Sequence, residues 1–237
     1  DNILMRHYGR LQDLEWTTRQ HFRTKVDQEA DEFIRKRIKD TFPDHNIYSE
    51  EERAKETGHN LSWVVDPLDG TIPYTLGISD HFSVCIALAS GNRPIVGVVY
   101  APKRKELYFA EEGKGAFCNG NQLEVSKERK INHAIIGLDG GKETPEFRRS
   151  SLAPYIEKAF SPDGVSCIVN YGCASLPINF VAKGSLHAYI ALSLEPWDMA
   201  AGVVINREAG ANVTNIDGGQ WTLDDHSILT SNPILHR

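Results

Sequence analysis

The most regular hydrophobic pattern near the start of the chain follows Thr24. Hydrophobic residues recur there at the spacing of one helix face, at Val26, Ala30, Phe33, Ile34 and Ile38. Thr24 can cap such a helix, with Asp27 three residues later as its partner in a capping box. The pattern predicts a helix that begins after Thr24 and ends at Phe42-Pro43-Asp44.

Shorter hydrophobic runs predict β-strands. Residues 62–65 predict a buried strand that ends at Asp66, and residues 82–89 and 95–100 predict two strands on either side of a turn. Residues 106–110 predict a further strand, and the glycines and asparagines between positions 113 and 121 predict tight turns after it.

The second part of the chain alternates helical and strand patterns. Residues 140–164 predict a helix flanked by loops, 174–182 a helix, 186–192 a strand, 197–208 a helix with Pro196 in its first turn, and 228–230 a last short strand. With no linker-like segment between them, residues 1–237 are expected to form a single domain. Its N-terminal half (1–138) and C-terminal half (139–237) meet just before the loop at residue 140.

Composition narrows the functional classes. The 237 residues are 41% hydrophobic and 24% charged, which is ordinary for a protein with a real core. The net charge of −6 and the lack of a Lys/Arg block argue against a nucleic-acid partner. No hydrophobic run is long enough to span a membrane, and no signal peptide is evident. The four cysteines form no CxxC pair, so we expect reduced thiols, no zinc site and a cytoplasmic protein.

Two acidic segments far apart in the chain carry the candidate chemistry. Asp66 and Asp69 follow the hydrophobic run Trp63-Val64-Val65, and Asp198 stands in the segment Glu195-Pro196-Trp197-Asp198. A carboxylate beside a buried run is costly unless it is paired, and Mg²⁺ prefers such oxygen ligands. The two segments therefore predict one metal site, which suggests phosphoryl chemistry.

Each acidic element also has a simpler interpretation. Asp66 to Gly70 has the composition of a turn, and Glu50-Glu51-Glu52 is typical of a solvated run of charge. Asp27 completes a capping box with Thr24, and Asp198 suits a helix N-terminus. Their joint occurrence is harder to explain in these terms.

These segments resemble the inositol monophosphatase family of magnesium-dependent, lithium-sensitive phosphatases, which are related to fructose-1,6-bisphosphatases. The resemblance covers nearly the whole chain. Residues 66–71 match the signature Asp-Pro-x-Asp-Gly-Thr, and residues 197–202 match Trp-Asp-x-Ala-Ala-Gly. Ser49-Glu50-Glu51 matches a Gly-Glu-Glu element, Thr24 and Asp27 match Thr-x-x-Asp, and residues 113–120 look like a further family segment. The resemblance implies an α/β layered fold, an alternating αβαβα sandwich of the sugar-phosphatase type.

The resemblance also implies a site for two to three Mg²⁺ ions. Glu50, Asp66 and the backbone carbonyl of Leu68 would hold the first ion. Asp66, Asp69 and Asp198 would hold the second, and a third, weaker ion would lie against Glu50. Paired metal ions suit an in-line displacement at phosphorus, in which positioning and charge neutralisation dominate catalysis.

Further roles follow from the same resemblance. The backbone N–H groups of Gly70 and Thr71 would hold phosphate oxygens, Asp27 and Thr71 would orient the attacking water, and Glu51 would support the site. Ala174 and Ala191 are the candidate substrate-binding residues. Inositol-specific members tend to carry Glu where Ala191 stands, so strict inositol specificity is not expected here.

Two smaller departures leave the metal residues intact. Pro73 stands where the family often has Asn, and Ser49 replaces the Gly of Gly-Glu-Glu. The expected function is magnesium-dependent hydrolysis of small phosphate monoesters such as inositol-1-phosphate or related polyol and sugar phosphates. The expected form is a homodimer without nucleic-acid or membrane partners.

Three alternatives differ from this expectation in substrate, mechanism or functional class. Fructose-1,6-bisphosphate or a 3′-phosphonucleotide could be the substrate within the same fold. A haloacid-dehalogenase-type phosphatase is disfavoured, because two residues separate Asp66 from Asp69 where that class has one. An inactive metal-dependent regulatory protein would be supported by a lost ligand, and none is lost.

Overall fold

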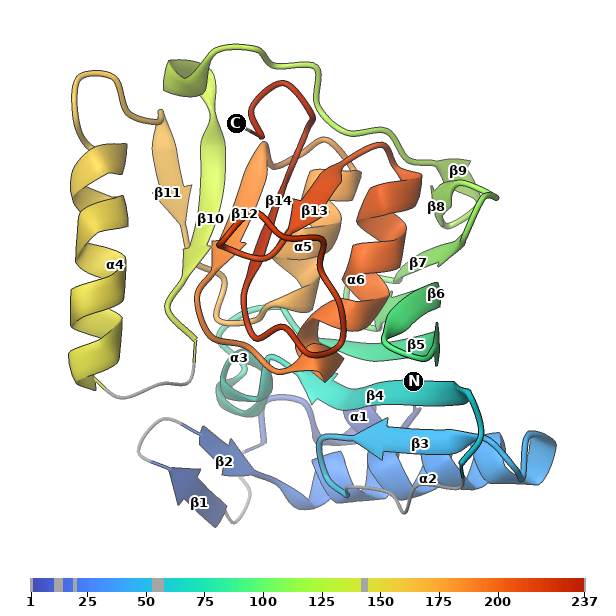
Figure 1. Cartoon of the computed structure of the whole chain (residues 1–237). Coiled ribbons are helices and arrows are strands. Elements are labelled where there is room, and N and C mark those ends of the chain that lie inside the picture. Colours follow the sequence, from blue (N-terminus) through green and yellow to red (C-terminus); the bar gives the residue numbers. More distant parts are fainter. Residues whose placement is uncertain (1, 11–14, 19–20, 53–57, 142–144, 237) are drawn as a thin grey trace.

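The computed structural model describes residues 2–10, 15–18, 21–52, 58–141 and 145–236. Two large β-sheets and three layers of helices alternate in this part of the chain (Figure 1). Helices α1 (Asn2–His7) and α2 (Lys25–Thr41) lie outside the first sheet, and α4 (Pro145–Ala159) lies outside the second. Helices α5 (Ser175–Ala182) and α6 (Pro196–Glu208) pack between the sheets. The expected αβαβα layering is confirmed.

The first sheet has seven strands in the order of the chain. Strands β3 and β4 are parallel, and each later pair is antiparallel. The strands expected at 82–89, 95–100 and 106–110 are confirmed. The bounds are β3 Asn46–Ser49, β4 Leu61–Asp69, β5 Ser83–Ser90, β6 Arg93–Ala101, β7 Glu106–Glu111, β8 Ala116–Cys118 and β9 Asn121–Gln122.

Strand β4 is longer than expected. The sequence predicted that it ends at Asp66, but pairing with β5 resumes at Asp69, opposite Ser83. Between Asp66 and Asp69 the register shifts, because three steps along β4 match only two along β5. An irregularity of this kind tolerates Pro67, which cannot donate to a ladder, and it re-aims the neighbouring side chains. The segment that resembles a turn is therefore a bulged strand end.

The second sheet has five strands in the order β11-β10-β12-β14-β13. Strands β11, β10 and β12 are parallel, whereas β14 is antiparallel to both of its neighbours. The strands expected at 186–192 and 228–230 are confirmed, and the other three strands were not predicted. The bounds are β10 Ile135–Asp139, β11 Cys167–Val169, β12 Ala188–Ala191, β13 Asn212–Thr214 and β14 Ile228–Ser231.

The remaining described elements are short. Helix α3 (Thr71–Leu76) follows β4 directly, and a 3-10 turn spans Ile131–His133. A two-stranded hairpin, β1 (Glu15–Thr18) and β2 (His21–Arg23), precedes α2. No described helix is both long and hydrophobic enough to cross a bilayer.

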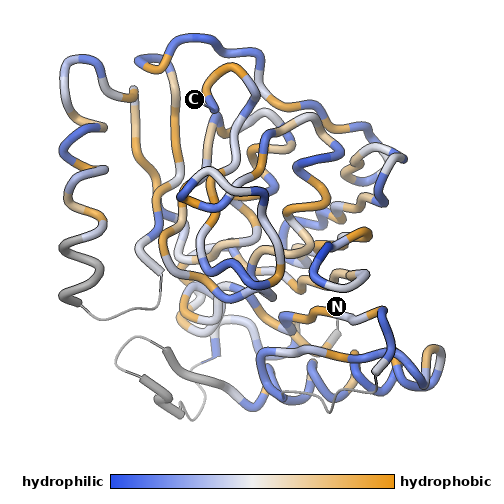
Figure 2. The backbone as a smooth tube through the Cα atoms, viewed as in Figure 1, coloured by the Kyte–Doolittle hydropathy of each residue, from blue (hydrophilic) through white to orange (hydrophobic). Residues whose placement is uncertain are grey.

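The middle helix layer forms most of the hydrophobic core. Figure 2 shows the contrast between hydrophobic strands and the largely hydrophilic α2. Helix α6 is buried from Pro196 to Asn206 and contacts both sheets. It approaches α5 closely at Gly202, where a Cβ atom would lie 2.5 Å from a methyl carbon of Ile178. The small residues of Trp-Asp-x-Ala-Ala-Gly thus have a packing role, because a larger side chain would push the two helices apart.

Candidate active site

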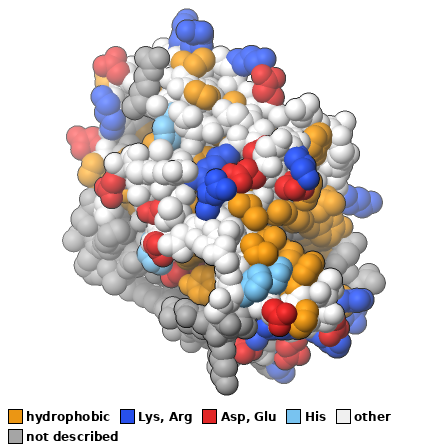
Figure 3. Space-filling view, turned by 45° about the vertical axis from the view of Figure 1, so that its right-hand side comes forward, with side chains coloured by type: hydrophobic (Ala, Val, Ile, Leu, Met, Phe, Trp, Pro, Cys, Tyr) orange, Lys and Arg blue, Asp and Glu red, His pale blue; other side chains and the backbone are white. Residues whose placement is uncertain are grey.

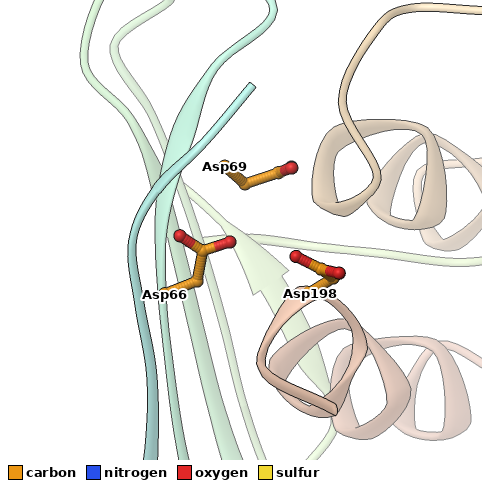
Figure 4. A group of neighbouring side chains, drawn as sticks. All are labelled: Asp66, Asp69 and Asp198. Atoms are coloured by element: carbon orange, nitrogen blue, oxygen red, sulfur yellow. The ribbon is translucent and has the colours of Figure 1, made fainter. Parts of the chain in front are cut away.

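Three aspartates from the two acidic segments meet in one place. Asp66 and Asp69 come from the end of β4, and Asp198 comes from the first turn of α6 (Figure 4). One carboxylate oxygen from each lies within 4.8 Å of the others. All three side chains are buried. The expected meeting of the two segments is therefore observed.

Asp66 is placed by the bulge in β4. The Leu68 N–H donates to the Asp66 carboxylate over 2.9 Å. The carbonyl of Leu68 in turn accepts a hydrogen bond of 3.1 Å from the Thr71 hydroxyl. These two bonds fold the segment back on itself, so that Asp66, Leu68 and Thr71 form one compact unit.

Asp69 lies at the N-terminus of α5. It accepts hydrogen bonds from the backbone N–H groups of Ala174 (3.0 Å) and Ser175 (2.7 Å) and from the Ser175 hydroxyl (2.5 Å). The N-terminus of a helix favours negative charge. Burial, followed by the neighbouring charge of Asp198, nevertheless raises the pKa of Asp69. This side chain is thus held firmly while carrying an electrostatic cost that a cation would offset.

Ser175 and Ser83 were missed as functional residues. The Ser175 hydroxyl also lies 2.6 Å from the hydroxyl of Ser83, which is completely buried on β5. Ser175 follows the start of the expected helix at 174–182, where serine is favoured as a cap, so a weak signal existed. No sequence pattern linked Ser83 to Ser175, since 92 residues separate the two serines.

Asp198 combines its two interpretations. Its carboxylate accepts a 2.9 Å hydrogen bond from the backbone N–H of Glu195, which completes a capping box at the start of α6. Figure 4 shows the same carboxylate pointing toward Asp66 and Asp69. The cap therefore fixes the orientation of a side chain that also belongs to the acidic trio.

Asp27 occupies the equivalent position in α2. Its carboxylate accepts hydrogen bonds from the Thr24 backbone N–H (2.9 Å) and the Thr24 hydroxyl (2.5 Å), so the expected capping box is confirmed. Burial, assisted by the charge of Glu50, raises the pKa of Asp27 to about 6. Asp27 is not among the three aspartates that converge in the part of the chain that the structure describes.

The Glu50-Glu51-Glu52 run divides into two parts. Glu52 is exposed and pairs with Arg35, as a solvated charge would. Glu50 and Glu51 are half-buried. Ser49 is paired with Val65 in the parallel β3–β4 ladder, so Glu50 comes one residue later, beside Asp66. Glu50 lies outside the close group of ligand atoms found among the described residues.

The two departures near the site are accommodated by packing. Ser49 is completely buried and donates its hydroxyl proton to the buried carboxylate of Asp31, so the added side chain is satisfied. Pro73 stands in the first turn of α3, where a missing N–H costs no hydrogen bond within the helix.

Gly70 forms the junction between β4 and α3. Its φ of +83° is in the left-handed region that favours glycine. A Cβ atom here would also lie 2.4 Å from the carbonyl oxygen of His81. Thr71 then begins α3 and is half-buried. Both constraints require glycine at this position, because no other residue fits the turn.

The two candidate substrate residues differ in their surroundings. Ala174 precedes α5 and contacts Asp69 through its backbone N–H. Ala191, at the end of β12, is completely buried, so its methyl group reaches no solvent.

Comparison with known proteins gives a consistent match. The family model described as "Inositol monophosphatase family" matches residues 2–237. An inositol-1-monophosphatase from Bacillus subtilis (strain 168) is 35% identical over 220 residues, which cover 90% of this chain and 80% of the relative. "Nus factor SuhB" from Pasteurella multocida (strain Pm70) is 34% identical over 240 residues, which cover 99% of this chain and 85% of the relative.

Solved structures share the fold. The structure of the Thermotoga maritima IMPase matches with a TM-score of 0.88 and 31% identity. The match covers 99% of this chain and 88% of that one. The layers described above are therefore those of a known phosphatase fold.

Proposed function

Because the chain belongs to the inositol monophosphatase family, we propose that it hydrolyses phosphate monoesters of inositol and related polyols or sugars in a metal-dependent reaction. The observation that carries this proposal is the convergence of Asp66, Asp69 and Asp198, whose oxygens lie within 4.8 Å of one another. Carboxylates packed this closely repel one another, and divalent cations offset that repulsion.

The residues fit magnesium in particular. Carboxylate oxygens are hard donors of the kind that Mg²⁺ prefers, and no thiol or imidazole belongs to the close group among the described residues. Two to three ions are proposed, with Glu50 and the Leu68 carbonyl completing the set of ligands. Bound ions of this kind lower the pKa of water and neutralise charge on both sides of a transferring phosphoryl group.

The protein residues have positioning roles in this proposal. Gly70 and Thr71 hold phosphate oxygens through backbone N–H groups, and the rigid Gly70 turn supports that role. Asp27 and Thr71 orient the attacking water, and Glu51 assists them. Asp27 suits this task because its capping box fixes its carboxylate and its pKa is raised to about 6.

A direct test uses phosphate release from myo-inositol-1-phosphate. We expect release with Mg²⁺, complete loss on addition of excess chelator, and recovery when Mg²⁺ is restored. Full activity in excess chelator would contradict the metal-dependent mechanism. Fructose-1,6-bisphosphate and adenosine-3′,5′-bisphosphate belong in the same assay, because they are the alternative substrates within this fold.

A regulatory role without catalysis is the alternative from another class. This alternative is considered because one relative is named "Nus factor SuhB" and not as a phosphatase. The acidic trio is intact, and this favours an enzyme. Phosphate release that is absent from every ester tested, despite Mg²⁺ binding, would favour the regulatory alternative.

Three further properties are proposed on the family resemblance: a homodimer, inhibition by lithium and a cytoplasmic location. Hydrophobic side chains gather over part of the face in Figure 3. Exposed hydrophobic patches often mark protein–protein interfaces, and this supports the proposed homodimer. Sedimentation of the purified protein and an assay with added LiCl would test the first two.

A further inference from the structure

Strands β10 and β12 end beside each other at a change of direction in the fold. They are parallel neighbours, and Asp139 and Ala191, their last residues, are paired in register. The chain leaves β10 toward α4 on the outer face of the sheet, whereas it leaves β12 toward α6 on the inner face (Figure 1). In open α/β sheets, ligands bind outside the carboxyl ends of strands at such a point.

The side chain of Asp139 lies on the inner face. Residues paired in register share a face, and so do residues two apart on one strand. Asp139, Ala191 and Tyr189 therefore lie on the same side of the sheet. Ala191 and Tyr189 belong to the core formed with α5 and α6, so Asp139 faces the layer that carries Asp198.

The Asp139 carboxylate is held in place by a short turn. The N–H of Gly141 donates to it over 2.7 Å, and Gly141 has a φ of +71°. A Cβ atom on Gly141 would lie 1.6 Å from the carbonyl oxygen of Ser193, so this turn is packed tightly against the β12–α6 connection. Asp139 is half-buried, whereas Ala191 beside it is completely buried. Of this pair, only Asp139 can reach a ligand.

A second polar group lies on the same face. Tyr189 is 2% exposed, and its hydroxyl has no hydrogen-bond partner among the described residues. Its ring lies across Gly137, two residues before Asp139, where a Cβ atom would be only 2.6 Å from the ring. Burial raises the pKa of Tyr189, and the nearby charges of Asp139, Asp69 and Asp198 contribute in the same direction.

Cys173 lies between the Asp139 region and the acidic trio. It directly precedes Ala174, whose N–H binds Asp69. Burial and the charge of Asp69 raise the pKa of its thiol, and Asp139 contributes as well. Ala191, the register partner of Asp139, belongs to the same hydrophobic cluster as Cys173, Ala174 and Trp197. The Ala174 N–H binds Asp69, and Trp197 directly precedes Asp198, so Asp139 borders the layer that holds two members of the acidic trio.

We propose that Asp139 accepts a hydrogen bond from a hydroxyl group of the substrate's alcohol part while the phosphate lies at the acidic trio. This rests on the proposed function and names the side chain that would contact the alcohol part of the substrate. A carboxylate accepts from hydroxyl groups and repels a second phosphate. The preferred class is then a polyol or sugar monophosphate, with bisphosphates disfavoured at this position.

The test compares two esters with the same ring. Myo-inositol-1-phosphate carries free hydroxyls, and cyclohexyl phosphate carries none. We expect Asp139→Ala to lower the inositol-to-cyclohexyl ratio of kcat/KM by about tenfold or more, because a charged hydrogen bond is lost. Activity on cyclohexyl phosphate should stay within about twofold of wild type, since that ester makes no such bond. Asp163→Ala, which removes an exposed carboxylate from another loop, should leave the ratio unchanged.

Asp139→Asn controls for a structural defect caused by loss of the hydrogen bond from Gly141. An amide can keep the Gly141 hydrogen bond, and we expect it to lower the ratio by a smaller factor than alanine does. Equal losses on both esters in folded Asp139→Ala and Asp139→Asn would overturn the assignment, as would an unchanged ratio. If the wild type releases phosphate from neither ester in Mg²⁺, the proposed function itself fails, and this assignment fails with it.

Discussion

The starts of α2 and α6 show the same local structure with different surroundings. Each helix carries an aspartate that accepts a hydrogen bond from the backbone N–H of its N-cap residue, Asp27 from Thr24 and Asp198 from Glu195. Both aspartates are buried. Asp198 converges with Asp66 and Asp69, whereas Asp27 has Glu50 as a neighbouring charge.

A capping motif can also supply a side chain to a functional site. A capping box satisfies the helix terminus and also fixes a carboxylate in space. Whether that carboxylate joins a candidate metal site depends on which other carboxylates the fold brings to it. Here the bulged end of β4 brings two more aspartates to α6.

Substitution of Asp198 should lower kcat more than substitution of Asp27 does. We expect Asp198→Asn to lower kcat by at least about 10²-fold. The substitution removes a negative charge that would hold a metal ion, and the metal ions stabilise the transition state. Asparagine is also favoured near helix N-termini, so the fold should survive. Steady-state kinetics with circular dichroism would measure both. Asp225→Asn is the control, since Asp225 accepts a 2.7 Å bond from Thr222 in a turn and should leave kcat unchanged. A folded Asp198→Asn enzyme of nearly normal activity would reduce Asp198 to a helix cap.

A smaller effect is expected at Asp27. Asp27→Asn should lower kcat by about tenfold, because the amide still accepts from Thr24 but loses the charge that orients water. The Mg²⁺ concentration for half-maximal activity should stay the same in Asp27→Asn and rise in Asp198→Asn. Magnesium titrations of both variants would decide this. A rise in both would place Asp27 among the metal ligands, together with Asp198.

The sequence predicted one side of this comparison better than the other. Periodicity located α2 and α6, and both capping aspartates were visible as local patterns. The meeting of Asp66, Asp69 and Asp198 followed from the family resemblance and from the cost of burying carboxylates. It did not follow from periodicity, which carries no information on contacts across the chain.

The misses have physical causes. The bulge in β4 was read as a strand end because Pro67 is a turn residue when taken alone. Strand β13 was missed because Val213 is its only hydrophobic residue, between Asn212 and Thr214. Strand β10 was missed because Gly137 interrupts its hydrophobic run, and β11 has only three residues. The hydrogen bonds that link Ser83, Ser175 and Asp69 were missed because these residues lie on three separate elements, β5, α5 and β4.

Stabilisation by Mg²⁺ should depend on pH, because the acidic trio includes a carboxylate with a raised pKa. The pKa of Asp69 is raised by burial and by Asp198. In the metal-free fold, the contribution of Asp69 to stability is therefore fully present below the ordinary aspartate pKa and is lost as the pH rises through the raised pKa. We expect Mg²⁺ to raise Tm by about 5–10 °C at pH 7.5 and by less at pH 5. Thermal unfolding at both pH values, with and without Mg²⁺, would measure this. A larger gain at pH 5 would contradict the role given to the trio.

The smallest expected effect concerns how Asp69 is held. Ser175→Ala removes the hydroxyl that donates to Asp69 and meets Ser83, but it leaves the two backbone N–H donors in place. Since one of three donors is lost, we expect the Mg²⁺ requirement to rise by about threefold to tenfold, with little change in kcat at saturating Mg²⁺. Ser161→Ala is the control, because its hydroxyl bonds the Lys158 carbonyl on the surface and should alter neither value. An unchanged Mg²⁺ requirement in folded Ser175→Ala would show that the backbone of α5 alone positions Asp69, much as the backbone of Glu195 positions Asp198.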